Sequence, residues 1–160
     1  MKRHTIVVGI TLAVGLLLSG PLFAQAQESL YGTWKINIAK SKYSPGPAPK
    51  SSIAKWEPSD GGVKLTVDIV PATGEAQHFE CSGKFDGKDN KVVGNNPDAD
   101  TMAFSKIDDH TYRVAQKKGG KPTLTSRIVV AKDGKTRVTT QTGTNGKGET
   151  AAITMFYEKQ

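Results

Sequence analysis

The chain has 160 residues, with 22 lysines and arginines against 15 aspartates and glutamates and a formal net charge of +7 at pH 7. This length suits one domain with a single core. The basic residues are dispersed through the expected turns and outer strand faces, a pattern typical of a solubilising surface and unlike a clustered nucleic-acid footprint. We therefore expect no nucleic-acid partner.

The N-terminus has the three parts of a secretory signal peptide. A basic start is followed by an apolar run over residues 6–18 and by an A-x-A cleavage pattern that ends at Ala26. The run is short for a membrane span, and no cysteine lies near the cleavage point to carry a lipid. We predict that residues 1–26 are a signal peptide and that residues 27–160 form an exported domain, periplasmic or secreted, without a stable membrane anchor. A retained N-terminal anchor helix is the alternative.

Residues 30–38 alternate apolar and polar side chains, as a half-buried strand does. Gly32 and Trp34 lie on the same face of this strand. The indole can therefore lie across bare backbone, with its N–H free to reach a partner at one end of a barrel. This Gly-x-Trp opening resembles the first strand of the lipocalin and calycin superfamily. The resemblance implies a barrel in which Trp34 plugs one end of the interior.

The segment that follows, residues 41–52, contains three prolines and a glycine between positions 45 and 49. Proline removes backbone donors and holds the chain in extended or turn geometry, so we predict a loop. It could form a lid over a barrel opening, as the long first loop of lipocalin-like proteins does. A plain surface crossover is the alternative.

From residue 53 onward, short β-rich runs alternate with clusters of Gly, Asp, Asn or Pro, at the spacing of an all-β sandwich or barrel. Eight further strands are expected, at residues 53–57, 63–70, 76–85, 101–107, 111–117, 123–131, 137–144 and 151–159. Strands joined by short turns most simply form an antiparallel meander, and a long meander avoids exposed edges by closing. We predict an all-β fold, a single antiparallel up-and-down barrel of about eight to ten strands, lipocalin-like, with helices short or absent.

Cys81 is the single cysteine, so no intramolecular disulfide can form. It alternates in phase with Phe79 and Phe85, which predicts a buried thiol that packs as a small hydrophobe. A reactive or dimer-forming thiol is the alternative. We expect a monomer.

Two groups of polar residues contain atoms that could bind a metal. His78 and Glu80 share a strand face, but the inward phase of Phe79 turns them outward, so a solvated cross-strand pair is the favoured interpretation. Asp108, Asp109 and His110 meet at a turn. Because the chain has no Ser-His-Asp spacing, nucleophile elbow or His-Glu-x-x-His, we predict no enzyme, no metal site and no cofactor.

The last strand resembles that of fatty-acid-binding proteins, in which an Arg-x-Tyr pair grips the lipid carboxylate. Tyr157 matches the tyrosine, whereas Met155 stands at the arginine position. The apolar methionine favours a neutral ligand or a filled core.

The chain is also similar to a family of small exported bacterial proteins of uncharacterised function. The similarity rests on Gly-Thr-Trp-Lys at 32–35, the Asn-x-Ala-Lys-Ser-Lys segment at 37–42 and the Ser-Pro-Gly-Pro-Ala-Pro-Lys loop at 44–50. It implies export and this fold, and it leaves the activity open.

Several apolar and aromatic side chains fall on inward phases of the expected strands. The predicted ligand-binding residues are Trp34, Ile36, Leu65, Phe79, Phe104, Ile128, Met155 and Tyr157. A barrel of this size is either filled by side chains or wide enough for one small ligand. We predict non-catalytic binding of a small hydrophobic molecule in the interior. The alternative is a structural or protein-interaction module of the cell envelope with a filled core.

Overall fold

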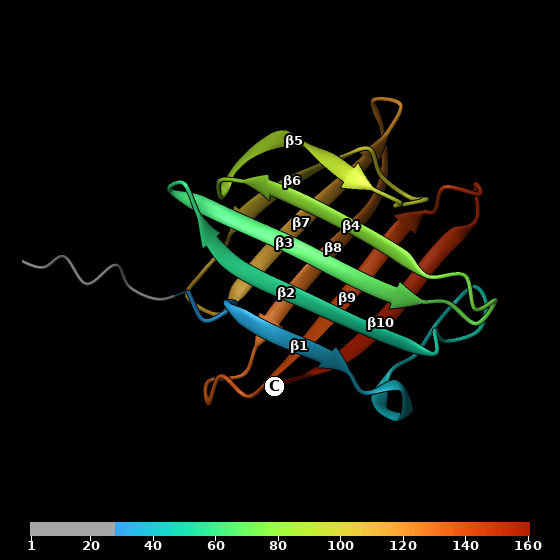
Figure 1. Cartoon of the computed structure of the whole chain (residues 1–160), viewed down its shortest axis with the longest axis horizontal. Coiled ribbons are helices and arrows are strands. Elements are labelled where there is room, and N and C mark those ends of the chain that lie inside the picture. The colour runs from blue at the N-terminus through green and yellow to red at the C-terminus, as the bar shows by residue number, and fades with distance from the viewer. Residues whose placement is uncertain (1–27) are drawn as a thin grey trace, which may run out of the picture.

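The computed structural model describes residues 28–160, and the predicted signal peptide at residues 1–26 lies outside these described residues. Ten strands follow one another along the chain, with one short 3-10 helix, η1 (Ile38–Lys40), after the first (Figure 1). The strands are β1 (Gly32–Ile36), β2 (Ser51–Ser59), β3 (Gly62–Val70), β4 (Gln77–Gly83), β5 (Asp86–Gly94), β6 (Thr101–Lys106), β7 (Thr111–Lys118), β8 (Lys121–Val130), β9 (Thr136–Thr144) and β10 (Thr150–Lys159). None of the helical segments in residues 28–160 is long and apolar enough to cross a membrane.

Every strand pairs antiparallel with its neighbours in sequence, and β1 also pairs with β10, so the sheet closes into a barrel. The predicted all-β, antiparallel up-and-down barrel is therefore confirmed, with ten strands. Its inner face follows the sequence alternation: in β3, Val63, Leu65 and Val67 are buried. The β2–β3 hairpin turns at Asp60 and Gly61, whose positive φ angles of 38° and 75° suit an Asp-Gly turn between right-twisted strands.

Strand β5 is absent from the prediction, which assigned its first residues to a turn. Its sequence, Asp-Gly-Lys-Asp-Asn-Lys-Val-Val-Gly, is polar on both faces, and Val92 is its one buried side chain. A register shift against β6 between Asp86 and Asp89 further breaks the alternation. The segment is a strand because β4 and β6 supply backbone partners on either side.

The predicted first strand is longer than β1. The chain leaves the sheet after Ile36, since the Asn37 side chain accepts a hydrogen bond from the Lys40 backbone N–H at 3.2 Å and caps η1. Ile38, predicted on the buried face, is 37% exposed. A local cap therefore overrides the apolar alternation here.

One end of the barrel, which we call the closed end, is where β1 begins, β10 finishes and the β2–β3, β4–β5, β6–β7 and β8–β9 turns lie (Figure 1). Large side chains with less than 2% exposure fill it, namely Trp34, Tyr112, Phe104, Leu30 and Val63. The Trp34 indole Nε1 donates to the Leu30 carbonyl at 2.7 Å. The indole N–H therefore has a hydrogen-bond partner at one end of the barrel, as expected. This end is solid.

The first described residues cross the closed end and hold it shut. Tyr112 Oη donates to Glu28 Oε2 at 2.7 Å, and Lys106 Nζ lies 3.0 Å from the same oxygen. Ser29 Oγ donates to the Asp109 carbonyl at 2.7 Å. The hydrogen bond to Glu28 raises the pKa of Lys106 above its ordinary value. Together these contacts bind Glu28 and Ser29 to the β6–β7 hairpin.

The hydroxyl of Tyr112 can be tested as the centre of this contact. Tyr112→Phe should lower the free energy of unfolding by about 1–3 kcal/mol, because it removes a hydrogen bond to a partly buried carboxylate, which then keeps Lys106 as its charged partner. Urea denaturation monitored by circular dichroism measures the change. Tyr31→Phe is the matched control: the Tyr31 hydroxyl donates to the Gly62 carbonyl over 3.3 Å at a less buried position, so its removal should cost less. Equal losses in the two variants would contradict this account.

Candidate functional site

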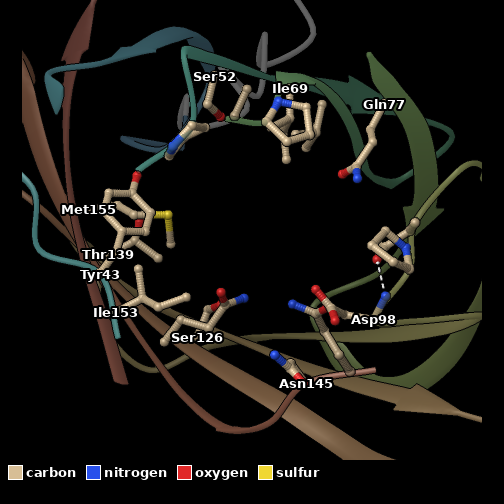
Figure 2. Close-up of a pocket in the computed structure, with 18 of the residues that line it drawn as sticks. Tyr43, Ser52, Ile69, Gln77, Asp98, Ser126, Thr139, Asn145, Ile153 and Met155 are labelled. Atoms are coloured by element: carbon tan, nitrogen blue, oxygen red, sulfur yellow. Dashed lines mark hydrogen bonds between the residues drawn. The ribbon is translucent and has the colours of Figure 1, made fainter. Parts of the chain in front are cut away.

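The barrel encloses a cavity of about 540 Å³ between the closed end and the loops at the opposite end, the open end. Its mouth is formed by the loops that follow β1, β3, β5 and β9. The volume falls in the range of about 300–1,000 Å³ typical of small-molecule sites. Figure 2 shows the cavity as an open space ringed by side chains, with Ser52, Ile69 and Gln77 along one side and Tyr43, Met155 and Ile153 along another.

The two walls of the cavity differ in polarity. Strands β2–β4 together with β6 supply a mainly apolar wall of Ala54, Trp56, Leu65, Val67, Phe79 and Met102. Across the barrel, strands β7–β9 contribute Gln116, Ser126, Arg137, Thr139 and Gln141. The lining therefore complements a molecule with a large apolar part and a few polar atoms.

The eight predicted ligand-binding residues divide between the cavity and the core beneath it. Five line the cavity, namely Leu65, Phe79, Ile128, Met155 and Tyr157. Trp34, Ile36 and Phe104 are outside the lining and are buried in the core. Strand alternation shows which face a residue occupies but says nothing of its depth along the barrel, so the sequence could not separate these two groups.

The loop between η1 and β2, for which a lid and a plain surface crossover were the alternatives, lies at the mouth of the cavity. Tyr43, Pro45, Pro47 and Pro49 all line the cavity. The loop is tied to β10, because Lys42 and Thr154 exchange backbone hydrogen bonds at 2.7 and 2.8 Å and the Ala152 N–H donates to the Ser44 carbonyl at 2.7 Å. It thus continues the barrel wall beyond the end of β1.

Arg137 is one of the lining residues that the sequence interpretation missed. It lies on β9, directly opposite Tyr157 of β10, and is 3% exposed. Its Cζ lies 4.2 Å from the ring centroid of Tyr157 and 5.2 Å from that of Trp34, which stabilises the cation through the ring faces. Burial lowers the pKa of Arg137 to about 10, so the guanidinium is still charged at neutral pH.

A signal for Arg137 was present in the β8–β9 hairpin. Val130 lies on the buried face of β8, and its direct partner across the hairpin is Arg137. Opposite residues of an antiparallel pair share a face, so Arg137 must point inward with Val130. The interpretation of Met155 as a mark of a neutral ligand considered the last strand alone, whereas the interior receives an arginine from β9.

The hydrogen-bonding capacity of the guanidinium is largely unused. Arg137 Nη1 donates to Thr139 Oγ1 at 3.3 Å, and Nε has no partner. Trp56 Nε1, on the opposite wall, is likewise a buried donor without an acceptor. Nearby, Ser52 Oγ and Tyr157 Oη lie 3.2 Å apart and satisfy each other. The lining therefore contains two pure donors without a protein acceptor, together with Tyr43 Oη, which also has no partner and can donate or accept.

The polar residues considered as metal ligands lie outside the barrel. His78 Nδ1 is 2.7 Å from Asp68 Oδ1, and Glu80 Oε2 is 2.9 Å from Lys64 Nζ, each pair bridging β3 and β4 on the exposed face. The predicted cross-strand pairing is confirmed. No cluster of three or more potential metal ligands occurs within residues 28–160.

Comparisons with known proteins give one distant structural likeness. No protein-family model and no curated protein sequence matches the chain. The crystal structure of zebrafish ileal bile acid-binding protein complexed with cholic acid is 10% identical, with a TM-score of 0.44, and the match covers 82% of this chain and 99% of that one.

Cys81 lies within the β3–β4–β5 part of the sheet and is 1% exposed, as its phase predicted. Burial raises the pKa of the Cys81 thiol to about 11. Because the thiolate is the reactive form, this thiol should be inert in the folded protein.

Ellman's reagent at pH 8 tests this expectation. We expect no thiol to react in the native protein and one thiol per chain to react in guanidinium chloride. The control is Ser82→Cys in a Cys81→Ala background, which places a thiol on the exposed face one residue along and should react at once. Labelling of native Cys81 at the rate of the control would restore the reactive-thiol alternative.

Proposed function

We propose that the protein is an exported, monomeric, non-catalytic binding protein that holds one small, largely apolar molecule inside its barrel. The observation that supports this proposal is the cavity of about 540 Å³, which side chains leave open although they tightly fill the other end of the same barrel. A structural module would gain stability by filling this space, because each missing side chain forfeits buried area and contacts. Retaining an apolar cavity with a mouth favours a ligand.

The lining also supports binding over catalysis. Its two carboxylates, Asp98 and Glu149, belong to the mouth loops and are committed to loop structure. Asp98 accepts the Gly146 backbone N–H at 2.7 Å, and Glu149 accepts the Asn145 side-chain amide at 2.9 Å. Apart from Arg137, the deeper polar residues carry neutral hydroxyls and amides, which orient a ligand without exchanging protons with it.

The two tryptophans provide an internal test, because Trp56 lines the cavity and Trp34 lies outside the lining. Titration of the Trp34→Phe variant, in which Trp56 is the remaining fluorophore, should give a saturable change with at least one member of a panel of fatty acids, retinoids, quinones and sterols. The Trp56→Phe variant should bind the same compound with a much smaller change in fluorescence. Circular dichroism establishes that both variants are folded.

An independent measurement is mass spectrometry of an organic extract of the purified protein, which should contain a co-purified apolar molecule. A flat response across the panel together with an empty extract would overturn the binding proposal in favour of the structural or interaction module. A ligand-dependent fluorescence change in the Trp56→Phe variant, with none in the Trp34→Phe variant, would contradict the position of the site.

A further inference from the structure

We propose that the bound molecule is an amphiphile with an anionic head group, such as a carboxylate, and that it binds with the head at the floor of the cavity against Arg137. This inference rests on the proposed function, since it specifies the chemistry of the ligand in the same cavity. It replaces the neutral ligand that Met155 alone suggested.

The first support is the geometry of the guanidinium. Its Cζ lies over the ring faces of Tyr157 and Trp34, 4.2 and 5.2 Å from the ring centroids, so side chains from β10 and β1 contact the cation. The N–H donors lie in the plane of the guanidinium, at its edge. One donates to Thr139 and Nε has no partner. A planar carboxylate matches such an edge with two parallel hydrogen bonds.

The second support is electrostatic. No carboxylate within residues 28–160 lies at ion-pair distance from Arg137. A buried charge is normally paired, because removal from water is costly and a counter-ion offsets that cost. The carboxylates of the lining are on the mouth loops, where Asp98 and Glu149 already accept hydrogen bonds. An anion delivered by the ligand would supply the missing partner.

The third support is the balance of donors and acceptors around the cavity. Trp56 Nε1 is a second buried donor without an acceptor, and it comes from the apolar wall. Trp56 Nε1 and Arg137 Nε can donate and cannot accept, whereas the third orphaned group of the lining, Tyr43 Oη, can do either. A ligand rich in acceptor oxygens satisfies this lining, whereas an ammonium would face a cation and further donors.

The apolar wall distinguishes an amphiphile from a small inorganic anion. Leu65, Val67, Phe79 and Met102 extend along the cavity between the floor and the mouth loops and offer no charge to an ion. They suit an alkyl or ring system, whose burial provides the bulk of the affinity. The guanidinium then selects the head group and fixes which end of the ligand enters first.

Three probes that share one alkyl chain test the head group on the unaltered protein: laurate, dodecanol and dodecyltrimethylammonium, each below its critical micelle concentration. Calorimetry or Trp56 fluorescence gives their dissociation constants. Laurate should bind about tenfold to a hundredfold more tightly than dodecanol, the ratio expected for hydrogen bonds to a charged group. The ammonium should bind more weakly than both.

Two variants locate the effect. Arg137→Gln should remove the preference for laurate over dodecanol while leaving dodecanol binding within about threefold, since the apolar wall is intact. The matched control is Arg127→Gln, which removes the same charge from an exposed position on β8 and should keep the full preference. If Arg137 were purely structural, its substitution would lower the melting temperature without changing the ratio of the two affinities.

The outcomes separate the two proposals. Equal affinity for laurate and dodecanol in the unaltered protein would overturn the anionic head group and leave the binding function standing. A preference for laurate that survives in Arg137→Gln would overturn the role of Arg137. Failure of all three probes, together with the flat panel and empty extract described above, would remove the binding function itself. The comparison of laurate with dodecanol needs no variant, so it tests the anionic head group even if Arg137→Gln does not fold.

Discussion

The short ladder between β1 and β10 is the interaction on which the rest of the molecule depends. Trp34, Lys35 and Ile36 pair with Lys159, Glu158 and Tyr157, and these pairs turn an open meander into a ring. Closure removes the two exposed strand edges that a ten-strand sheet would otherwise present. It also brings the N-terminal Trp34 beside the C-terminal Tyr157, so the two aromatic faces that hold Arg137 come from opposite ends of the described chain.

The interior of the barrel has a tightly filled half and a half that contains the cavity. Large aromatic and aliphatic side chains fill the closed end, and the Glu28–Tyr112–Lys106 contacts cover it from outside. The core there is packed as in any stable domain. The stability gained from that packing offsets the stability lost to the cavity, which side chains do not fill in the other half of the barrel. Arg137 lies where the two halves meet.

The sequence was sufficient for the fold and insufficient for the site, for physical reasons that particular residues illustrate. Alternation over residues 63–70 gave the buried face of β3 directly, and Asp-Gly turns gave the up-and-down order. The sequence did not predict strand β5, because backbone pairing with β4 and β6 stabilises this strand and its own side chains show no apolar alternation. The sequence also did not show how far along the barrel axis a side chain lies. Trp34 and Leu65 follow the same alternation, yet only Leu65 lines the cavity.

Arg137 shows a different limit of sequence interpretation. Arginine is rarely buried, so inward phase alone did not mark it as part of the interior. Its role depends on two rings from β1 and β10, which the closure of the barrel brings together. Such a site is defined by tertiary contacts, and the hairpin partner Val130 was the one local indication of it.

The loop that extends the wall beside β10 has a consequence for the timing of ligand exchange. Backbone hydrogen bonds hold Lys42 and Ser44 against Thr154 and Ala152, so this part of the wall opens by breaking several bonds together. A molecule that leaves by this side of the mouth would therefore depart at the rate at which the seam opens. Under the proposed binding function, the opening of this seam would set the residence time of the ligand, and Arg137 at the floor would set which molecule is retained.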